Sequence, residues 1–570
     1  MILTIEKDMA AAVGFKKLAP FGLDENNFSW RGKMYLNLAE LDDDKLGKLK
    51  KVFEASKDVD GAGAMSRDVS TWMSAKSNVA GTKPRTVKQY ETILQHYLLG
   101  VDGHRLYEKE DEVWLPYYVS QVKFHDADER RQQTPHVTMT LVYEDFGGRQ
   151  STTQSFHFED IRGKTVVESL LAKGYVAETP MLRKEHQAQA TRFTQICNGI
   201  GVQFNAKGFA TDNVDGNPDS ADRYSHDRFM MVREGVPSRV VMDVFYESDT
   251  HESGRGVVVD PTYWDRVRKG PKKGEDIEDV DISDEGGAHA QPEIPLHPYC
   301  AVFDLGRHLR LRTHVMNLTE YVYDDHLSDK LILDETMKKL VELLVDHHDG
   351  GFKDIVAGKG GGAVVLLGGP PGVGKTLTAE VYAESKHMPL YNVQCSQLGT
   401  DAVVLEARLL KVFRRAKRWN AIVLLDEADV YVRGRGTDLD QNAIVGVFLR
   451  VLEYQGSVLF LATNMPEEVD DAIASRCIAR LDYQRPDEIL EAKIWRVLAD
   501  TAGAKISDET ISHLVLQTRS GARGAGVQGR SGRDVKNLLK LAMLVTKGKE
   551  IKLDTVKFVE RFQPWRKAEK

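Results

Sequence analysis

The residues best suited to chemistry in this chain form a glycine-rich run that ends in a lysine and a threonine. Residues 369–376 read Gly-Pro-Pro-Gly-Val-Gly-Lys-Thr and follow the pattern G-x-x-x-x-G-K-[ST] in full. The glycines let backbone N–H groups turn inward around phosphate oxygens, and the start of the following helix adds partial positive charge. Lys375 would reach the β and γ phosphates, and the Thr376 hydroxyl would bind Mg²⁺. The nucleotide-binding candidates in this run are Gly369, Pro370, Pro371, Gly372, Val373, Gly374, Lys375, Thr376 and Leu377.

Two adjacent carboxylates form the second candidate group. The apolar residues 421–425 lead directly into Asp426 and Glu427. We expect Asp426 to hold a hydrated Mg²⁺ and Glu427 to orient and polarise the attacking water as general base. Carboxylates at the end of a buried strand are costly unless their charges have a partner. Asp429 is expected to be structural.

Asn464 is the third candidate. It follows the apolar residues 458–462 and Thr463. A neutral polar side chain here fits a sensor that contacts the γ-phosphate and places the attacking water without adding negative charge. An ordinary strand-to-turn asparagine is the alternative when this motif is considered alone.

Three arginines complete the set. Arg476, and as second choice Arg480, could reach across a subunit boundary to the γ-phosphate of a neighbour and stabilise the transition state. A surface salt bridge is the alternative for either one. Arg533 lies in the first turn of a predicted helix, where it could act as a second nucleotide sensor or simply as a helix-start arginine. The predicted apolar face of this helix consists of Val535, Leu538, Leu539 and Ala542.

A parallel sheet would bring these residues together. From Tyr299 onward, strand-sized apolar runs such as 363–367 and 458–462 alternate with helical stretches. That pattern is typical of a parallel sheet with helices on both faces. The predicted fold class is therefore α/β, with the candidates at the ends of the strands.

In this order, the motifs resemble the AAA+ superfamily, and within it a group of large, mostly uncharacterised ATPases abundant in filamentous fungi. Residues 367–380, 425–430, 442–454 and 472–476 carry the resemblance. It implies a P-loop NTPase core with a five-stranded parallel sheet flanked by helices, followed by a helical lid. It also implies ATP bound with Mg²⁺, hydrolysis to ADP and phosphate, and assembly of identical subunits into a ring, usually a hexamer. Hydrolysis would then drive remodelling of a protein or protein complex.

One segment departs from many members of that family. Protein-threading members carry an aromatic-hydrophobic-glycine loop after the second strand, whereas residues 395–404 contain no aromatic side chain. Leu398 is the only weak substitute we identify. Threading of an unfolded chain is therefore in doubt, while remodelling of a folded partner stays open.

Composition sets the remaining boundaries. The stretch 266–295 is rich in glycine and charge, with almost no aromatic content, and reads as a charged linker or mobile loop. The region before it mixes β-branched strands with helices near 43–56 and 86–99. The predicted divisions are 1–265, an α+β region for client or partner recognition; 266–295, the linker; 296–349, a connecting segment; 350–486, the ATPase core; and 487–570, the helical lid.

The overall composition excludes some classes of function. The 570 residues are 42% hydrophobic and 28% charged with a net charge of −8, as in soluble globular proteins. No apolar run approaches the roughly 20 residues that span a bilayer, and no signal peptide is evident, so we expect a cytoplasmic protein without a membrane partner. The cysteines are far apart in the sequence and are expected to be buried reduced thiols rather than a zinc site or a disulfide framework: Cys197, Cys300, Cys395 and Cys477.

Two other functions compete with protein remodelling. The basic stretch 414–419 and the Gly/Arg-rich stretch 519–533 could contact phosphates in a nucleic-acid-directed motor or loader, a reading we do not favour. An ATP-gated scaffold that turns over slowly is the second alternative. The client cannot be identified from these residues.

Overall fold

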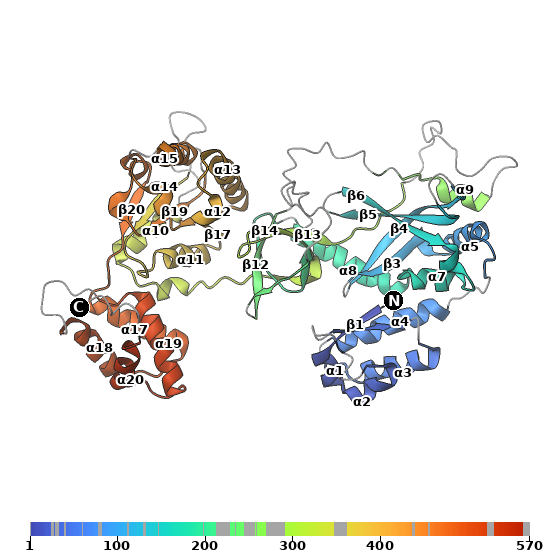
Figure 1. Cartoon of the computed structure of the whole chain (residues 1–570), viewed down its shortest axis with the longest axis horizontal. Helices are drawn as coiled ribbons and strands as arrows, with labels where there is room; N and C mark the ends of the chain where they lie inside the picture. Colours follow the sequence, from blue (N-terminus) through green and yellow to red (C-terminus); the bar gives the residue numbers. More distant parts are fainter. Residues whose placement is uncertain are drawn as a thin grey trace. The chain divides into compact units, whose positions relative to one another are not determined.

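The chain folds into two compact units, which are described separately. The first comprises residues 1–198, 244–300 and 313–316; the second comprises 199–243, 301–312 and 317–570. Figure 1 shows the chain and labels many of its helices and strands. The computed structural model describes residues 2–23, 28, 33–38, 41–59, 61–77, 83–110, 113–128, 133–145, 148–197, 199–211, 228–233, 235–243, 257, 259–269, 291–346, 362–435, 439–453, 456–520 and 529–562.

The first unit is built on a five-stranded antiparallel sheet in the order β6-β5-β4-β3-β7. Successive side chains of a strand point to opposite faces, so β3 and β4 contribute to two cores. Tyr107 and Trp114 enter one core, and their neighbours Leu106 and Leu115 enter the other. The strands are β3 Arg105–Glu110, β4 Val113–His125, β5 His136–Asp145, β6 Gly148–His157 and β7 Tyr175–Ala177.

Helices cover both faces of this sheet. The helices predicted near 43–56 and 86–99 are confirmed as α3 and α5, whose first turns are capped by Asp42 and Thr86. A short antiparallel pair, β1 Ile2–Glu6 and β2 Lys33–Asn37, precedes them. The helices are α1 Lys7–Val13, α2 Phe15–Leu18, α3 Asp43–Glu54, α4 Ala62–Ser77, α5 Val87–Leu99, α6 Phe158–Ile161, α7 Val166–Ala172, α8 Pro180–Cys197 and α9 Tyr263–Lys269.

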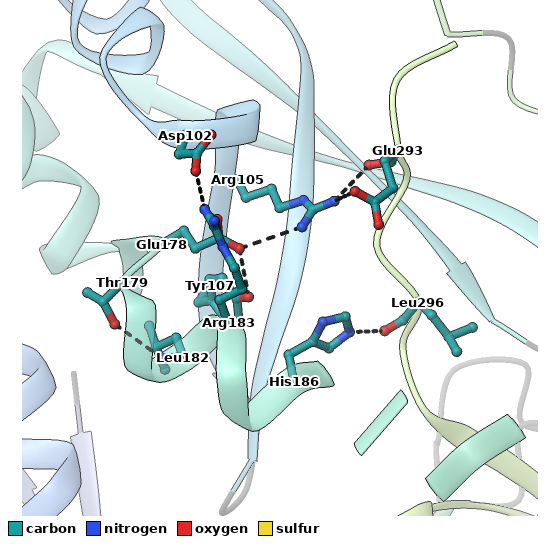
Figure 2. Close-up of polar contacts among 10 residues, drawn as sticks. All are labelled: Asp102, Arg105, Tyr107, Glu178, Thr179, Leu182, Arg183, His186, Glu293 and Leu296. Atoms are coloured by element: carbon teal, nitrogen blue, oxygen red, sulfur yellow. Dashed lines mark hydrogen bonds and ion pairs between the residues drawn. The ribbon is translucent and has the colours of Figure 1, made fainter. Parts of the chain in front are cut away.

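A buried carboxylate joins the strands of this unit to α8. Glu178 accepts a hydrogen bond from the Tyr107 hydroxyl at 3.1 Å and pairs with the Arg105 guanidinium at 3.6 Å. The Arg183 Nε also donates to it, at 2.9 Å, and the same guanidinium pairs with Asp102 (Figure 2). Because the Glu178 side chain is almost fully buried, these partners offset the cost of removing its charge from water.

The predicted linker at 266–295 is bounded by ordered residues. Its start belongs to α9, and residues 270–290 lie outside the described part of the chain. Near its end, Arg105 binds both the carbonyl oxygen of Glu293, at 3.3 Å, and the carboxylate, at 2.8 Å (Figure 2). The segment that leads into β13 is therefore held within the first unit.

An eight-stranded antiparallel sheet opens the second unit, in the order β10-β9-β14-β13-β12-β8-β15 with β11 paired to β12. The parallel pattern expected from Tyr299 onward is wrong for these strands, because Val240 lies opposite Asp304 in antiparallel register. The predicted connecting segment 296–349 contains β13, β14 and β15 of this sheet. A strand buried on both faces reads as a continuous apolar run in either kind of sheet. The strands are β8 Gln203–Ala206, β9 Phe209–Thr211, β10 Arg228–Met230, β11 Val232–Arg233, β12 Val236–Met242, β13 Tyr299–Asp304, β14 Leu309–His314 and β15 Leu318–Glu320.

The predicted five-stranded parallel sheet is confirmed, in the order β17-β18-β19-β16-β20. Side chains from β16 alternate between two cores: Val364 and Leu366 enter one, Val365 and Leu367 the other. The strands are β16 Val364–Gly368, β17 Leu390–Gln394, β18 Ile422–Asp426, β19 Leu459–Thr463 and β20 Ala479–Asp482. The helices are α10 Glu335–Asp346, α11 Lys375–Ser385, α12 Cys395–Leu398, α13 Ala402–Trp419, α14 Asp429–Val432, α15 Leu439–Leu452 and α16 Asp471–Ala474.

The antiparallel and parallel sheets of the second unit share one hydrophobic core. Phe303 of β13 packs against Tyr391 and Trp419, with ring centroids 5.4 and 5.0 Å apart. On β12, the Arg239 guanidinium pairs with the buried carboxylate of Glu384 at 2.7 Å. Glu384 lies in the last turn of α11, so the antiparallel sheet contacts the helix that begins at Lys375.

The C-terminal helices form a bundle with its own core around Trp495. The apolar face predicted for the Arg533 helix is confirmed, since Val535, Leu538, Leu539 and Ala542 are all buried. Among the described residues, no helix combines the length and apolar character that a membrane crossing requires. The helices are α17 Glu488–Ala502, α18 Asp508–Ser520, α19 Gly532–Thr546 and α20 Leu553–Glu560.

Replacing Glu491 with alanine is expected to destabilise this bundle by about 3 kcal/mol, because it removes one of the two carboxylates that pair with the buried guanidinium of Arg530 and leaves only Glu560, at 2.8 Å. The side chains of Glu491 and Arg530 are 0% and 9% exposed and lie 3.1 Å apart. Native-state hydrogen exchange at α19 would measure the loss. Arg496→Ala, which breaks an exposed pair with Asp508, serves as control and should cost less than about 1 kcal/mol. Equal effects from both substitutions would contradict the prediction.

Candidate functional site

The sequence-predicted residues meet at the carboxyl ends of three neighbouring strands, β16, β18 and β19. A pocket of about 1130 Å³ opens there, between this edge and the C-terminal bundle. Parallel strands place their carboxyl ends at one edge of a sheet, where ligands of α/β proteins bind. The candidate residues that line the pocket are Pro371, Gly372, Val373, Gly374, Lys375, Thr376, Leu377, Asp426, Glu427, Asn464 and Arg533.

The glycine-rich loop depends on glycine at specific positions. Gly369 has φ of 144°, and a Cβ there would lie 2.3 Å from the carbonyl oxygen of Tyr483. Gly372 has φ of 81°, and its Cβ would lie 2.8 Å from that of Arg533. Side chains would therefore strain the backbone and collide with neighbours at both positions. Gly369 and Pro370 are not among the residues that line the pocket; their carbonyl oxygens face Lys375 instead.

Lys375 begins α11 and places its ammonium among oxygen atoms. Its Nζ donates to the carbonyl oxygens of Gly369 and Pro370, at 2.6 and 2.9 Å, and to Oδ1 of Asn464 at 2.8 Å. Burial lowers the pKa of this lysine, and the nearby carboxylate of Asp426 opposes the shift. A partly desolvated cation at a helix N-terminus is well suited to bind phosphate.

The two carboxylates at the carboxyl end of β18, Asp426 and Glu427, differ in their surroundings. The Thr376 hydroxyl donates to Oδ2 of Asp426 at 2.9 Å, so two hard oxygen ligands lie side by side. Glu427 is exposed and has φ of 55°, a left-handed conformation that costs a non-glycine residue about 1–3 kcal/mol. This backbone turn carries the Glu427 side chain to the pocket, while Asp426 stays at the strand end.

Asp429 determines where Asn464 lies. Its Oδ1 accepts hydrogen bonds from the backbone N–H of Asn464, at 2.9 Å, and from the hydroxyl of Thr463. These hydrogen bonds agree with the structural role predicted for Asp429. Its carboxylate fixes the end of β19 and the asparagine that follows.

We expect Asp429→Ala to lower kcat about tenfold with little change in KM, because Asn464 would lose its anchor while the phosphate contacts persist. Asp429→Asn is the matched control, since an amide oxygen can still accept both hydrogen bonds. Steady-state ATP hydrolysis would measure both variants. The positioning role is wrong if asparagine restores no more activity than alanine.

The three arginines are placed differently from one another. Arg476 pairs with Glu453 at 2.6 Å and donates to the carbonyl oxygen of Ala472, and Arg480 pairs with Asp482 at 2.8 Å. Neither of these two is among the residues that line the pocket, whereas Arg533 of α19 is. The structure therefore brings Arg533, but not Arg476 or Arg480, to the pocket of its own chain.

Sequence reasoning missed one wall of the pocket. Residues 330–334, Met337 and Tyr483 line it, together with Ile494 and Leu498 of α17. Apart from Lys330 and Asp334, these side chains give the pocket a largely apolar surface, as a flat base would require. The short run Leu331-Ile-Leu333 is a weak signal, because nothing local distinguishes it from core.

Two further sequence expectations change. Two of the four cations in the basic stretch 414–419 contact other residues of the fold: Arg415 lies 4.8 Å from the Phe303 ring, and Arg418 lies 3.6 Å from Asp243. Residues 521–528 of the Gly/Arg-rich stretch lie outside the described part of the chain. Leu398 is 3% exposed in the core, so its suggested role as a substitute for a pore-loop aromatic is wrong.

A parallel sheet, a glycine-rich phosphate loop and paired carboxylates at one edge define a P-loop nucleotide-binding domain. Residues 365–485 match the family described as "ATPase family associated with various cellular activities (AAA)". The chain therefore contains an AAA ATPase domain, an enzyme module that binds and hydrolyses ATP.

Three known proteins are similar to this domain. The "Mitochondrial sorting homolog" of Caenorhabditis elegans is 31% identical over 190 residues, or 32% of this chain and 52% of that protein. "ATP-dependent zinc metalloprotease FtsH 2" of Bdellovibrio bacteriovorus is 29% identical over 34% of this chain and 32% of its own. Human "ATPase family AAA domain-containing protein 3B" is 29% identical over 30% of this chain and 29% of its own. The matches thus span about half the length of these relatives or less.

Among solved structures, a chain of the "E. coli MS115-1 HORMA:CdnC:Trip13 complex" is similar over 42% of this chain and 91% of that chain. Its TM-score is 0.34 and its sequence identity 16%. A likeness at this level says nothing about activity.

Proposed function

We propose that this protein assembles from identical subunits into a ring, in which ATP hydrolysis drives remodelling of a protein or protein complex. The observation that supports this proposal most directly is that Arg476 and Arg480 do not line the pocket of their own chain, whereas Arg533 does. Arg476 pairs with Glu453 outside the pocket that contains Lys375, Asp426 and Glu427. A hydrolytic site completed by the Arg476 of a neighbour would make turnover depend on assembly.

Magnesium fits the residues at the strand end. Thr376 and Asp426 present a hydroxyl and a carboxylate in mutual contact at 2.9 Å. Mg²⁺ binds through one or two such oxygen ligands and keeps water and phosphate in its other positions. We therefore propose Thr376 and Asp426 as its protein ligands; when bound, it would neutralise phosphate charge.

Four residues that line the pocket have separate roles in ATP hydrolysis. Glu427 accepts the proton of the attacking water as its oxygen bonds to the γ-phosphorus and the bond to the β-phosphate oxygen breaks. Asn464 orients that water, and Lys375 stabilises charge on the β and γ phosphates. Arg533, from the bundle, contacts the nucleotide and links hydrolysis to motion of the lid.

The sharpest test mixes two inactive variants. Lys375→Ala retains Arg476, and Arg476→Ala retains the phosphate site. Each alone should keep only a few per cent of the wild-type rate. A one-to-one mixture should recover about a quarter, because a quarter of random interfaces pair an intact phosphate site with an intact arginine. Failure to recover activity, with both variants assembled, would contradict a shared site.

The client remains to be identified by experiment, and we propose that the first unit selects it. We also propose that the chain belongs to the group of large ATPases, abundant in filamentous fungi, that its motifs resemble. We do not propose the zinc metalloprotease activity that the name of one relative gives. The described residues include no group of three or more His, Cys, Asp or Glu side chains able to hold a metal. A nucleic-acid-directed motor is disfavoured because Arg415 and Arg418 contact other residues of the fold.

A further inference from the structure

Two cysteines that are far apart in the sequence lie close together in the first unit, which includes the first two residues of β13. Cys197 is the last residue of α8 and Cys300 the second residue of β13, and their sulfur atoms lie 3.8 Å apart in hydrogen-bond contact. Both are free thiols. The expectation of reduced thiols is confirmed, whereas the expectation of burial is wrong for Cys197 and Cys477, which are only partly buried.

The two thiols differ in their surroundings. Cys197 is half-buried, whereas Cys300 is 0% exposed. The hydrogen bond from Cys300 lowers the pKa of Cys197. The same contact, together with burial, raises the pKa of Cys300. The more accessible sulfur therefore has the greater thiolate character, which is the form that reacts.

We propose that Cys197 and Cys300 form an oxidation site for hydroperoxides, with Cys197 as the reacting thiol and Cys300 as the resolving one. The Cys197 thiolate attacks the terminal oxygen of ROOH; the S–O bond forms, the O–O bond breaks, and ROH leaves with the proton. The sulfur loses the two electrons that the peroxide gains.

Resolution follows when Cys300 Sγ attacks the sulfur of the Cys197 sulfenic acid. An S–S bond forms, the S–OH bond breaks, and water leaves with the Cys300 proton. The sulfur atoms must approach from 3.8 Å to about 2.05 Å. In sum, two thiols and one hydroperoxide give one disulfide, one alcohol (or water, from hydrogen peroxide) and one water.

The remaining cysteines lack this arrangement. Burial raises the pKa of Cys395 to about 12 and that of Cys477 to about 11, and the Cys477 thiol donates to the carbonyl oxygen of Ile473. Cys197 and Cys300 also lie within two residues of points where the chain passes out of the first unit, after residues 198 and 300. A disulfide would tie these two passages of the chain together.

The test treats the reduced full-length protein with hydrogen peroxide, blocks remaining thiols with N-ethylmaleimide and analyses intact mass and peptides. The expected product is about 2 Da lighter than the reduced chain before blocking, with a Cys197–Cys300 linkage that dithiothreitol reverses. In Cys300→Ala, Cys197 should instead advance to sulfinic acid. Cys477→Ser is the matched control and should form the same disulfide as wild type.

Three results would overturn the proposal. The first is a wild-type protein in which peroxide converts Cys197 to sulfinic acid while Cys300 stays reduced. Another is equal peroxide reactivity of Cys197 and the buried Cys395. The third is a disulfide found only between chains. Because the wild-type protein alone decides these outcomes, a folding defect in Cys300→Ala would not obscure them.

Discussion

Glu427→Gln is expected to reduce ATP turnover at least about a hundredfold while ATP stays bound, because glutamine cannot accept the proton of the attacking water. The side chain lines the pocket, and a left-handed backbone turn at φ of 55° brings it there. The hydrogen bonds of Lys375 do not involve it. Steady-state phosphate release and equilibrium binding of ATP would measure the two properties separately.

A matched control for this substitution is Glu468→Gln. Glu468 pairs with Arg433 and is not among the residues that line the pocket. We expect it to retain near wild-type turnover. If Glu427→Gln hydrolysed ATP within a few-fold of wild type, Glu427 would not be the general base, and Asp426 or a water chain would have to take that role.

Lys375→Ala should weaken ATP binding about a hundredfold, corresponding to about 3 kcal/mol for charge-assisted hydrogen bonds to phosphate. The ammonium lies within 2.6 to 2.9 Å of three oxygens around the loop, which positions it for the β and γ phosphates. Titration with a fluorescent ATP analogue would measure the affinity.

Lys386→Ala is the control, because Lys386 follows the last residue of α11 at the end opposite Lys375. Its removal should leave nucleotide affinity within a few-fold of wild type. Equal loss from both substitutions would point to general weakening of α11. Unchanged binding in Lys375→Ala would exclude the loop as the phosphate site.

The phosphate site could be predicted from the sequence because its signals are local. Residues 369–376, Asp426 and Asn464 each follow a short apolar strand, and parallel strands collect such ends at one edge. The buried face of α19 could be predicted for the same reason, since a helix repeats its core contacts every three or four residues.

Other features depend on contacts between distant parts of the chain. Phe303 and Trp419 share a core across two sheets, and no pattern within either segment indicates the pairing. An antiparallel strand buried on both faces is indistinguishable by composition from a parallel one, which is why β13 was misassigned. The pairing of Cys197 with Cys300 is likewise set by tertiary structure alone.

The measurement that tests this account most directly is ATP turnover per subunit across a range of protein concentrations, with the assembly state of the Glu427→Gln variant determined in ATP. If Arg476 of a neighbour completes the site, specific activity should rise with protein concentration. The Glu427→Gln variant should accumulate as an ATP-bound ring. Constant specific activity from a protein that remains monomeric would contradict the shared site and the ring together.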